Sequence, residues 1–274
     1  MVPALAWGID PDHDRLGWQL AAFILGIFTL AVAVPISQMV RDRPEDYNLL
    51  PDGDTPTITP EAGATRRTPL NQLTTNRPAN VDLTTGQALR TPAFWFISFG
   101  HGFTSMIIIA IMAHLGFFIK DQGFDVQTTA WVVSLYSGVS MVFQIVGGYV
   151  GDRIPKRLAI FIFTSIQAGA VLVLTVSSTQ PMLYLFGVLF GIGFGGRNPL
   201  TTAIRGDYFG RASFGKILGL STVPMNVLLL VAAPFAGYMR DTLGNYTMAF
   251  IVLAALNFFG GVLFLMAKKP IVPA

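Results

Sequence analysis

Residues 94–119 read FWFISFGHGFTSMIIIAIMAHLGFFI and contain no Asp, Glu, Lys or Arg. A run of about 20 apolar residues is long enough to cross the hydrocarbon core of a bilayer as an α-helix. A helix is favoured there because it satisfies its backbone hydrogen bonds internally. This stretch therefore predicts a membrane-spanning helix.

Six further stretches have the same apolar character. They are Trp18–Val40, Ala130–Val150, Leu158–Val176, Met182–Ile204, Ile217–Tyr238 and Tyr246–Ala267. Only 12% of the 274 residues are charged, whereas soluble domains average about 25%. The sequence predicts an all-α polytopic membrane helical bundle with seven transmembrane helices.

The region between the first two predicted helices, residues 41–91, is rich in Pro, Thr, Asn and Asp. It is too polar to span a membrane and too poor in apolar residues to form a core. We expect a cytoplasmic linker that separates residues 1–40 from a six-helix region, residues 92–274. Within the linker, Thr84-Thr85-Gly86-Gln87 fits a capping box and predicts a short surface helix before the second span.

The distribution of positive charge predicts the orientation. Most of the 18 Lys and Arg residues fall in loops on one side of the predicted membrane, and the other side holds only Arg15, Lys120 and Arg240. The positive-inside rule then places the linker and C-terminus in the cytoplasm and the N-terminus outside. We expect a multi-pass protein of the plasma or inner membrane, and no nucleic-acid partner, because the basic residues follow the topology.

A glycine repeat lies inside the fifth predicted span. Gly187, Gly191 and Gly195 recur every four residues and predict a smooth face for a neighbouring helix, or room to bend beside Pro199. The stretch Gly191–Gly196 also satisfies the dinucleotide-binding pattern G-x-G-x-x-G. No strand precedes it, so a nucleotide site is not expected.

The loop between the third and fourth spans reads Gly148-Tyr149-Val150-Gly151-Asp152-Arg153-Ile154-Pro155-Lys156-Arg157. It resembles the glycine-x-x-x-aspartate-arginine-x-x-basic-basic loop of the major facilitator superfamily. Glycines there allow two helices to approach closely, and the aspartate caps a helix start or pairs with a cation. Gly148, Asp152, Arg153, Lys156 and Arg157 are the expected conformational motif, and an ordinary basic loop is the alternative.

Two other stretches, Arg41–Gly53 and Gly206–Gly215, resemble loops of the oxalate/formate antiporter-like and monocarboxylate-transporter-like branch. The resemblance aligns the seven spans with the sixth to twelfth helices of a twelve-helix carrier, so residues 92–274 correspond to its C-terminal half. Met1–Trp7 resembles the last turns of the preceding helix. We expect a truncated chain that lacks the first five helices, or one whose partner chain supplies them.

Arg197 is the most informative candidate site residue. It lies about 12 Å inside its span, whose cytoplasmic end is predicted at Arg205. An arginine at that depth usually faces a cavity and a partner, which predicts an anion-binding role with Asn198 and Thr201 completing a polar lining. Snorkelling to the interface and a structural ion pair are the alternatives.

His101 and His114 belong to the same span and lie about 220° apart around the helix, at 100° per residue. They are therefore not expected to face one cavity together. Thr104 and Ser105 lie on the face of His101. Either histidine is a candidate to bind a coupling proton or, alternatively, to form a hydrogen bond to a neighbouring helix.

The residues offer no enzyme site. There is no cysteine, and no pattern resembles a nucleophile triad, a paired-carboxylate site or a metal cluster, so neither a cofactor nor a metal is expected. The resemblance implies secondary transport of a small organic anion, of mono- or dicarboxylate type, with a coupling proton or counter-anion. A seven-helix receptor, a transport-incompetent fragment and a partner subunit are the alternatives.

Overall fold

The computed structural model of the chain describes residues 17–39, 83–210 and 213–270. These residues fall into two units, one helix near the N-terminus and a bundle from residue 83 onward. All regular structure in these ranges is helical, which confirms the predicted all-α fold. The predicted stub Met1–Trp7 and most of the linker, residues 41–91, lie outside the described residues.

Helix α2, Gly17–Met39, is the described part of the first unit and matches the predicted span Trp18–Val40. Its length is about 35 Å at 1.5 Å per residue, enough to cross a bilayer. Within its unit, apolar side chains such as Phe23 and Leu30 are exposed. This surface is suited to lipid or to other helices, not to water.

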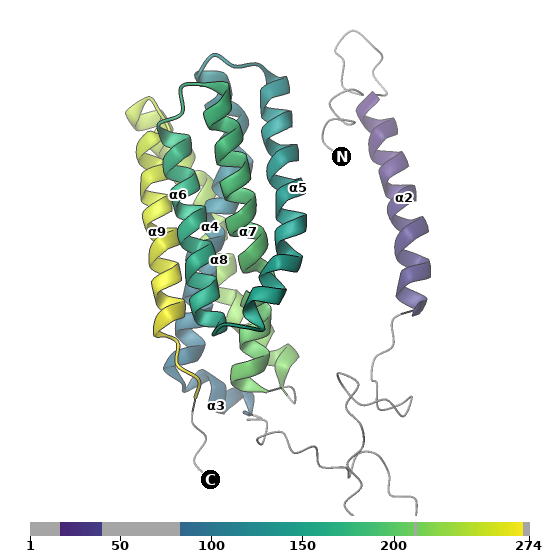
Figure 1. The fold of residues 1–274 in the computed structure, drawn as a ribbon, viewed down its shortest axis with the longest axis vertical. Helices are drawn as coiled ribbons and strands as arrows, with labels where there is room; N and C mark the ends of the chain where they lie inside the picture. The colour runs from purple at the N-terminus through teal and green to yellow at the C-terminus, as the bar shows by residue number, and fades with distance from the viewer. Residues whose placement is uncertain (1–16, 40–82, 211–212, 271–274) are drawn as a thin grey trace, which may run out of the picture. The chain divides into compact units, whose positions relative to one another are not determined.

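The second unit is a bundle of long helices preceded by one short helix. Its elements are α3 (Thr85–Leu89), α4 (Pro92–Asp121), α5 (Val126–Gly151), α6 (Lys156–Thr175), α7 (Gln180–Phe209), α8 (Phe214–Leu243) and α9 (Thr247–Met266). The long helices stand side by side, with α3 and the end of α9 at the same end of the bundle (Figure 1). The main packing partners run in the order α5, α7, α6, α9, α4, α8.

Five described helices, α4, α5, α6, α8 and α9, are long and apolar enough to cross a membrane. Helix α7 has 30 residues but is less apolar, because it contains two arginines and a series of glycines. It packs between α5 and α6, so neighbouring helices cover much of its length. The predicted six-helix region therefore corresponds to α4–α9.

The predicted capping box is confirmed at the start of the bundle. The backbone N of Thr84 donates to Gln87 Oε1 at 2.9 Å, and the Gln87 backbone N donates to Thr84 Oγ1 at 3.4 Å. Just before it, the Leu83 backbone N donates to Phe209 O at 3.0 Å. This bond ties the approach to α3 to the end of α7.

The glycine repeat packs against a helix backbone, as predicted. A Cβ atom on Gly191 would lie only 2.6 Å from Tyr136 O, and one on Gly195 would overlap Ser140 of α5. Gly187 faces Val132 of α5 in the same way. These glycines let α5 and α7 approach more closely than larger side chains allow.

Candidate functional site

Helix α7 carries two arginines that are almost completely buried, Arg197 at 1% exposure and Arg205 at 0%. The sequence placed Arg205 at the cytoplasmic end of its span, with the basic residues of that side. The structure differs in the environment of Arg205, because α7 continues to Phe209 and neighbouring helices enclose the side chain. Helix α7 therefore holds two enclosed cations.

Arg197 bonds to one residue of α4. Its Nη1 donates to Thr104 Oγ1 at 2.8 Å and its Nη2 approaches Thr104 O at 3.4 Å. Its Nε has no hydrogen-bond partner among the described residues. A guanidinium has five N–H donors, so the side chain is held in place while donors remain for another group.

Arg205 uses all three of its nitrogens. Its Nε donates to Ser221 Oγ of α8 at 2.5 Å, its Nη1 donates to Thr201 O, and its Nη2 lies 3.0 Å from His101 Nδ1 of α4. A guanidinium cannot accept a hydrogen bond, so His101 Nδ1 is the acceptor and the imidazole is the neutral Nε2–H tautomer. Arg205 thus connects α4, α7 and α8.

The two smaller residues predicted beside Arg197 have different positions. Thr201 is buried, and its hydroxyl donates to Asn198 O at 2.8 Å while its carbonyl accepts from Arg205. The Asn198 side chain is exposed, whereas Arg197 is buried. Successive residues of a helix lie 100° apart, so Asn198 does not share the buried face.

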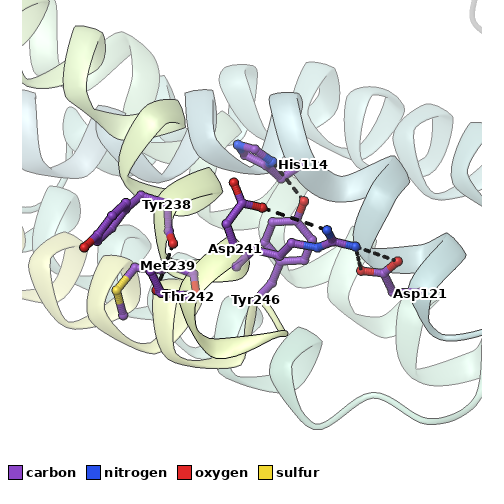
Figure 2. Close-up of polar contacts among 8 residues, drawn as sticks. His114, Asp121, Tyr238, Met239, Asp241, Thr242 and Tyr246 are labelled. Carbon is purple, nitrogen blue, oxygen red and sulfur yellow. Dashed lines mark hydrogen bonds and ion pairs between the residues drawn. The ribbon is translucent and has the colours of Figure 1, made fainter.

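His114 lies toward the other end of α4, away from the arginines. Its Nε2 donates to Ala233 O of α8 at 3.0 Å, and its Nδ1 lies 3.2 Å from the Tyr246 hydroxyl. Figure 2 shows His114 beside Tyr246, with Asp121 close by; Arg240 pairs with Asp121 at 3.3 Å. These bonds link the ends of α4, α8 and α9, so the two histidines belong to separate clusters.

The loop motif lies between α5 and α6. Asp152 is the exposed C-cap residue of α5 and does not cap α6, whose N-cap Pro155 has no side-chain cap bond. Arg153 stacks on the Tyr149 ring, with Cζ 3.3 Å from its centroid. Lys156 Nζ pairs with Asp207 Oδ2 of α7 at 2.8 Å, a partner that the sequence did not suggest.

The glycines of this loop follow the predicted packing only in part. A Cβ atom on Gly147 would overlap the backbone of Gly196, and one on Gly151 would overlap Leu200. A Cβ atom on Gly148 would meet nothing within 4 Å in the described part of the chain. The close approach to α7 is therefore made by Gly147 and Gly151, not by the motif residue Gly148.

The buried polar cluster of α4, α7 and α8 is suited to binding an anion. It brings together Arg197, Arg205, Thr104, Ser221 and His101, and neither guanidinium has a carboxylate partner within residues 83–210 and 213–270. Burying an unpaired cation is expensive. A negative group that enters this cluster would therefore be bound favourably.

The family model described as the Major Facilitator Superfamily matches residues 94–273. The chain is 28% identical over 149 residues to monocarboxylate transporter 13 of Rattus norvegicus, covering 54% of this chain and 35% of that protein. It is 26% identical over 181 residues to monocarboxylate transporter 2 of Mesocricetus auratus, covering 61% and 37%.

A bacterial relative, the uncharacterized transporter YycB of Bacillus subtilis (strain 168), is 23% identical over 163 residues, covering 59% of this chain and 40% of that protein. The matched stretches thus span between about a third and two fifths of the relatives' lengths.

Proposed function

Since the chain belongs to the Major Facilitator Superfamily, we propose that it is part of a secondary active transporter that moves a small organic anion by alternating access. It is a multi-pass membrane protein with apolar helices of membrane-spanning length. The proposal concerns the complete carrier, because the chain matches little more than a third of its relatives' length. In such a carrier, α4–α9 would form one six-helix half.

The observation that carries the proposal is Arg197, a guanidinium at 1% exposure whose Nε has no partner in the described residues. Translocon measurements assign about 2.5–3.5 kcal/mol to an arginine at the centre of a membrane helix. A carrier offsets that expense when its substrate supplies the missing negative charge. Relatives named monocarboxylate transporters support a carboxylate as that group.

The two arginines are suited to different tasks. Arg197 has unused donors, and a guanidinium binds a carboxylate through two parallel N–H···O bonds. Arg205 already has a hydrogen bond at each of its three nitrogens, to Ser221, Thr201 and His101, so it is more constrained than Arg197 and keeps only one further N–H on each Nη. We therefore assign primary substrate binding to Arg197 and place Thr104, its bonded neighbour, beside the substrate.

His101 is the better of the two candidates for a coupling proton. Its Nδ1 accepts from Arg205 and cannot take a proton while that bond lasts. An anion that draws Arg205 away would free Nδ1 and add a negative charge nearby, and both changes favour the imidazolium. His114 is bonded at both ring nitrogens to other helices, which supports a structural role. Exchange for a counter-anion remains the alternative form of coupling and requires no proton on His101.

The loop motif is proposed to act where the two halves of the carrier meet. Asp152 is exposed and has no ion-pair partner among the described residues, so it is free to contact another part of the complete carrier. Lys156 is already paired with Asp207 and holds the start of α6 against α7. Asp152→Asn is therefore expected to matter little for the stability of the isolated chain.

The proposed location is the cell membrane, with the C-terminus in the cytoplasm, together with the end of the bundle that carries α3. The Lys and Arg bias predicts that a reporter fused after Ala274 and one inserted near Thr65 both report cytoplasm. The measurement is the activity of a compartment-sensitive reporter pair, such as alkaline phosphatase and green fluorescent protein. An external signal from either position would reverse the proposed orientation.

A thermal-shift measurement on the purified chain tests the anion site without requiring transport. A bound ligand stabilises the folded state by RT ln(1 + [L]/Kd). Propionate, a generic monocarboxylate, should raise the melting temperature progressively with concentration, and its uncharged isostere propionamide should not. Equal shifts with the two compounds, or no shift with either up to high millimolar concentration, would contradict the proposal.

A further inference from the structure

A pocket of about 430 Å³ opens where α4 begins and α9 ends. Figure 1 shows these two helix ends at the same end of the bundle as α3. Its lining includes Arg90, Pro92, Ala93, Phe96, Met266 and Lys268. No residue of the pocket lining belongs to α7 or α8 or to the buried polar cluster around Arg197 and Arg205, so the pocket is separate from that cluster.

The charged part of the lining is entirely positive. Arg90 and Lys268 are exposed and come from segments far apart in the sequence, and no Asp or Glu lines the pocket. The first turn of α4, a helix of 30 residues that begins at Pro92, adds the partial positive charge of a helix N-terminus. The rim thus attracts an anion from two sides.

The part of the lining that the helices α4 and α9 supply is apolar. Ala93 and Phe96 belong to the first turns of α4, and Met266 is the last residue of α9. Beside them, Trp95 is 45% exposed and donates its indole N–H to Leu89 O at 3.0 Å. Exposed tryptophans of membrane proteins concentrate at the level of the lipid headgroups. Trp95 therefore indicates that the pocket lies at this level of the bilayer.

We infer that this pocket binds an anionic glycerophospholipid of the surrounding bilayer. The phosphate lies between Arg90 and Lys268, and the glycerol and first acyl methylenes pack on Phe96 and Met266. Basic pockets between membrane helices commonly hold lipid headgroups. A free phosphate ion would satisfy the cations but leave the apolar wall uncovered, so the lining favours the lipid over the soluble anion.

Native mass spectrometry of the purified chain, titrated with phosphatidylglycerol in detergent, measures the affinity of the first bound lipid. A juxtamembrane Lys or Arg contributes about 1 kcal/mol toward an anionic lipid surface, which corresponds to about 5-fold in affinity. Lys268→Gln should therefore weaken binding about 5-fold and Arg90→Gln/Lys268→Gln about 25-fold. Lys216→Gln, an exposed lysine at the same end that does not line the pocket, should leave the affinity unchanged.

Two comparison ligands separate the lipid from its parts. Phosphatidylcholine, which has the same glycerol and acyl groups without net charge, should bind more weakly than phosphatidylglycerol and respond little to the double substitution. Glycerol 3-phosphate, which has the charge without acyl chains, should not be retained at equal concentration. Equal loss with Lys216→Gln, or retention of glycerol 3-phosphate as strong as that of the lipid, would overturn the assignment. These outcomes do not depend on Arg197 or Arg205, so they test the lipid pocket independently of the proposed substrate site.

Discussion

In a complete carrier that contains these helices, replacing Arg197 with Gln is expected to lower uptake of its anionic substrate by about 100-fold or more. Removing one partner of a buried charge pair costs about 3–5 kcal/mol, and Arg197 is proposed to form that pair with the substrate. Membrane insertion should be unchanged or improved, because the desolvation of the guanidinium no longer has to be offset. The measurement is initial uptake of labelled substrate at equal membrane abundance.

Arg197→Lys provides the matched comparison, because it keeps the charge and loses the planar fork that binds a carboxylate through two bonds. Uptake should be weakened about 10-fold and not abolished, on the usual strength of one charge-assisted hydrogen bond. If the glutamine variant takes up substrate with unchanged affinity, Arg197 is a packing or snorkelling residue. The case for an anion bound at this position would then be lost.

The second large effect is expected from Gly147→Ala, which should destabilise the bundle by about 1–3 kcal/mol or more. The added methyl group would overlap the backbone of Gly196, and a backbone cannot rotate away as a side chain can. Gly148→Ala is the matched control, because nothing described lies within 4 Å of its added Cβ. That variant should be neutral or gain up to about 1 kcal/mol from helix propensity.

The comparison requires only melting temperatures of the two purified variants in the same detergent. A lower melting temperature for Gly147→Ala and an unchanged or higher one for Gly148→Ala is the expected pair of results. Equal melting temperatures would show that α5 and α7 separate easily, so that the glycine contacts do not hold the two helices together.

Most of the fold follows from local sequence signals. Long apolar runs predict α2 and α4–α9, and the Thr84–Gln87 capping box predicts α3. These signals work because the membrane requires helices and because a cap depends only on residues a few positions apart. Glycines at a spacing of four likewise predict a helix contact, since that spacing keeps Gly187, Gly191 and Gly195 on one face.

The site is less predictable, because it depends on contacts between distant segments. Arg205 looks like an interfacial cation in the sequence, and only its bonds to Ser221 of α8 and His101 of α4 show that it is enclosed. A polar residue at the end of an apolar run shows where the apolar stretch ends, whereas the helix can continue beyond it. The φ of +82° at Gly210 ends α7 five residues later.

The angular position of a residue around its helix explains the remaining differences between the predicted and the observed site. Gly147 and Gly148 are neighbours in the sequence, yet only Gly147 faces α7, because one residue turns the side-chain direction by 100°. The same rotation separates the exposed Asn198 from the buried Arg197. A sequence motif or a candidate residue identifies the helix segment that is involved. The neighbouring helix that this segment packs against decides which of its residues makes the contact.

The central claim, that Arg197 holds a carboxylate, is tested most directly by equilibrium binding of labelled propionate to the purified chain. The account predicts saturable binding to the native sequence, loss of that binding in Arg197→Gln and partial retention in Arg197→Lys. Lys120→Gln, which removes one exposed positive charge at the other end of α4, should bind like the native sequence. Equal dissociation constants for Arg197→Gln and Lys120→Gln would contradict the account.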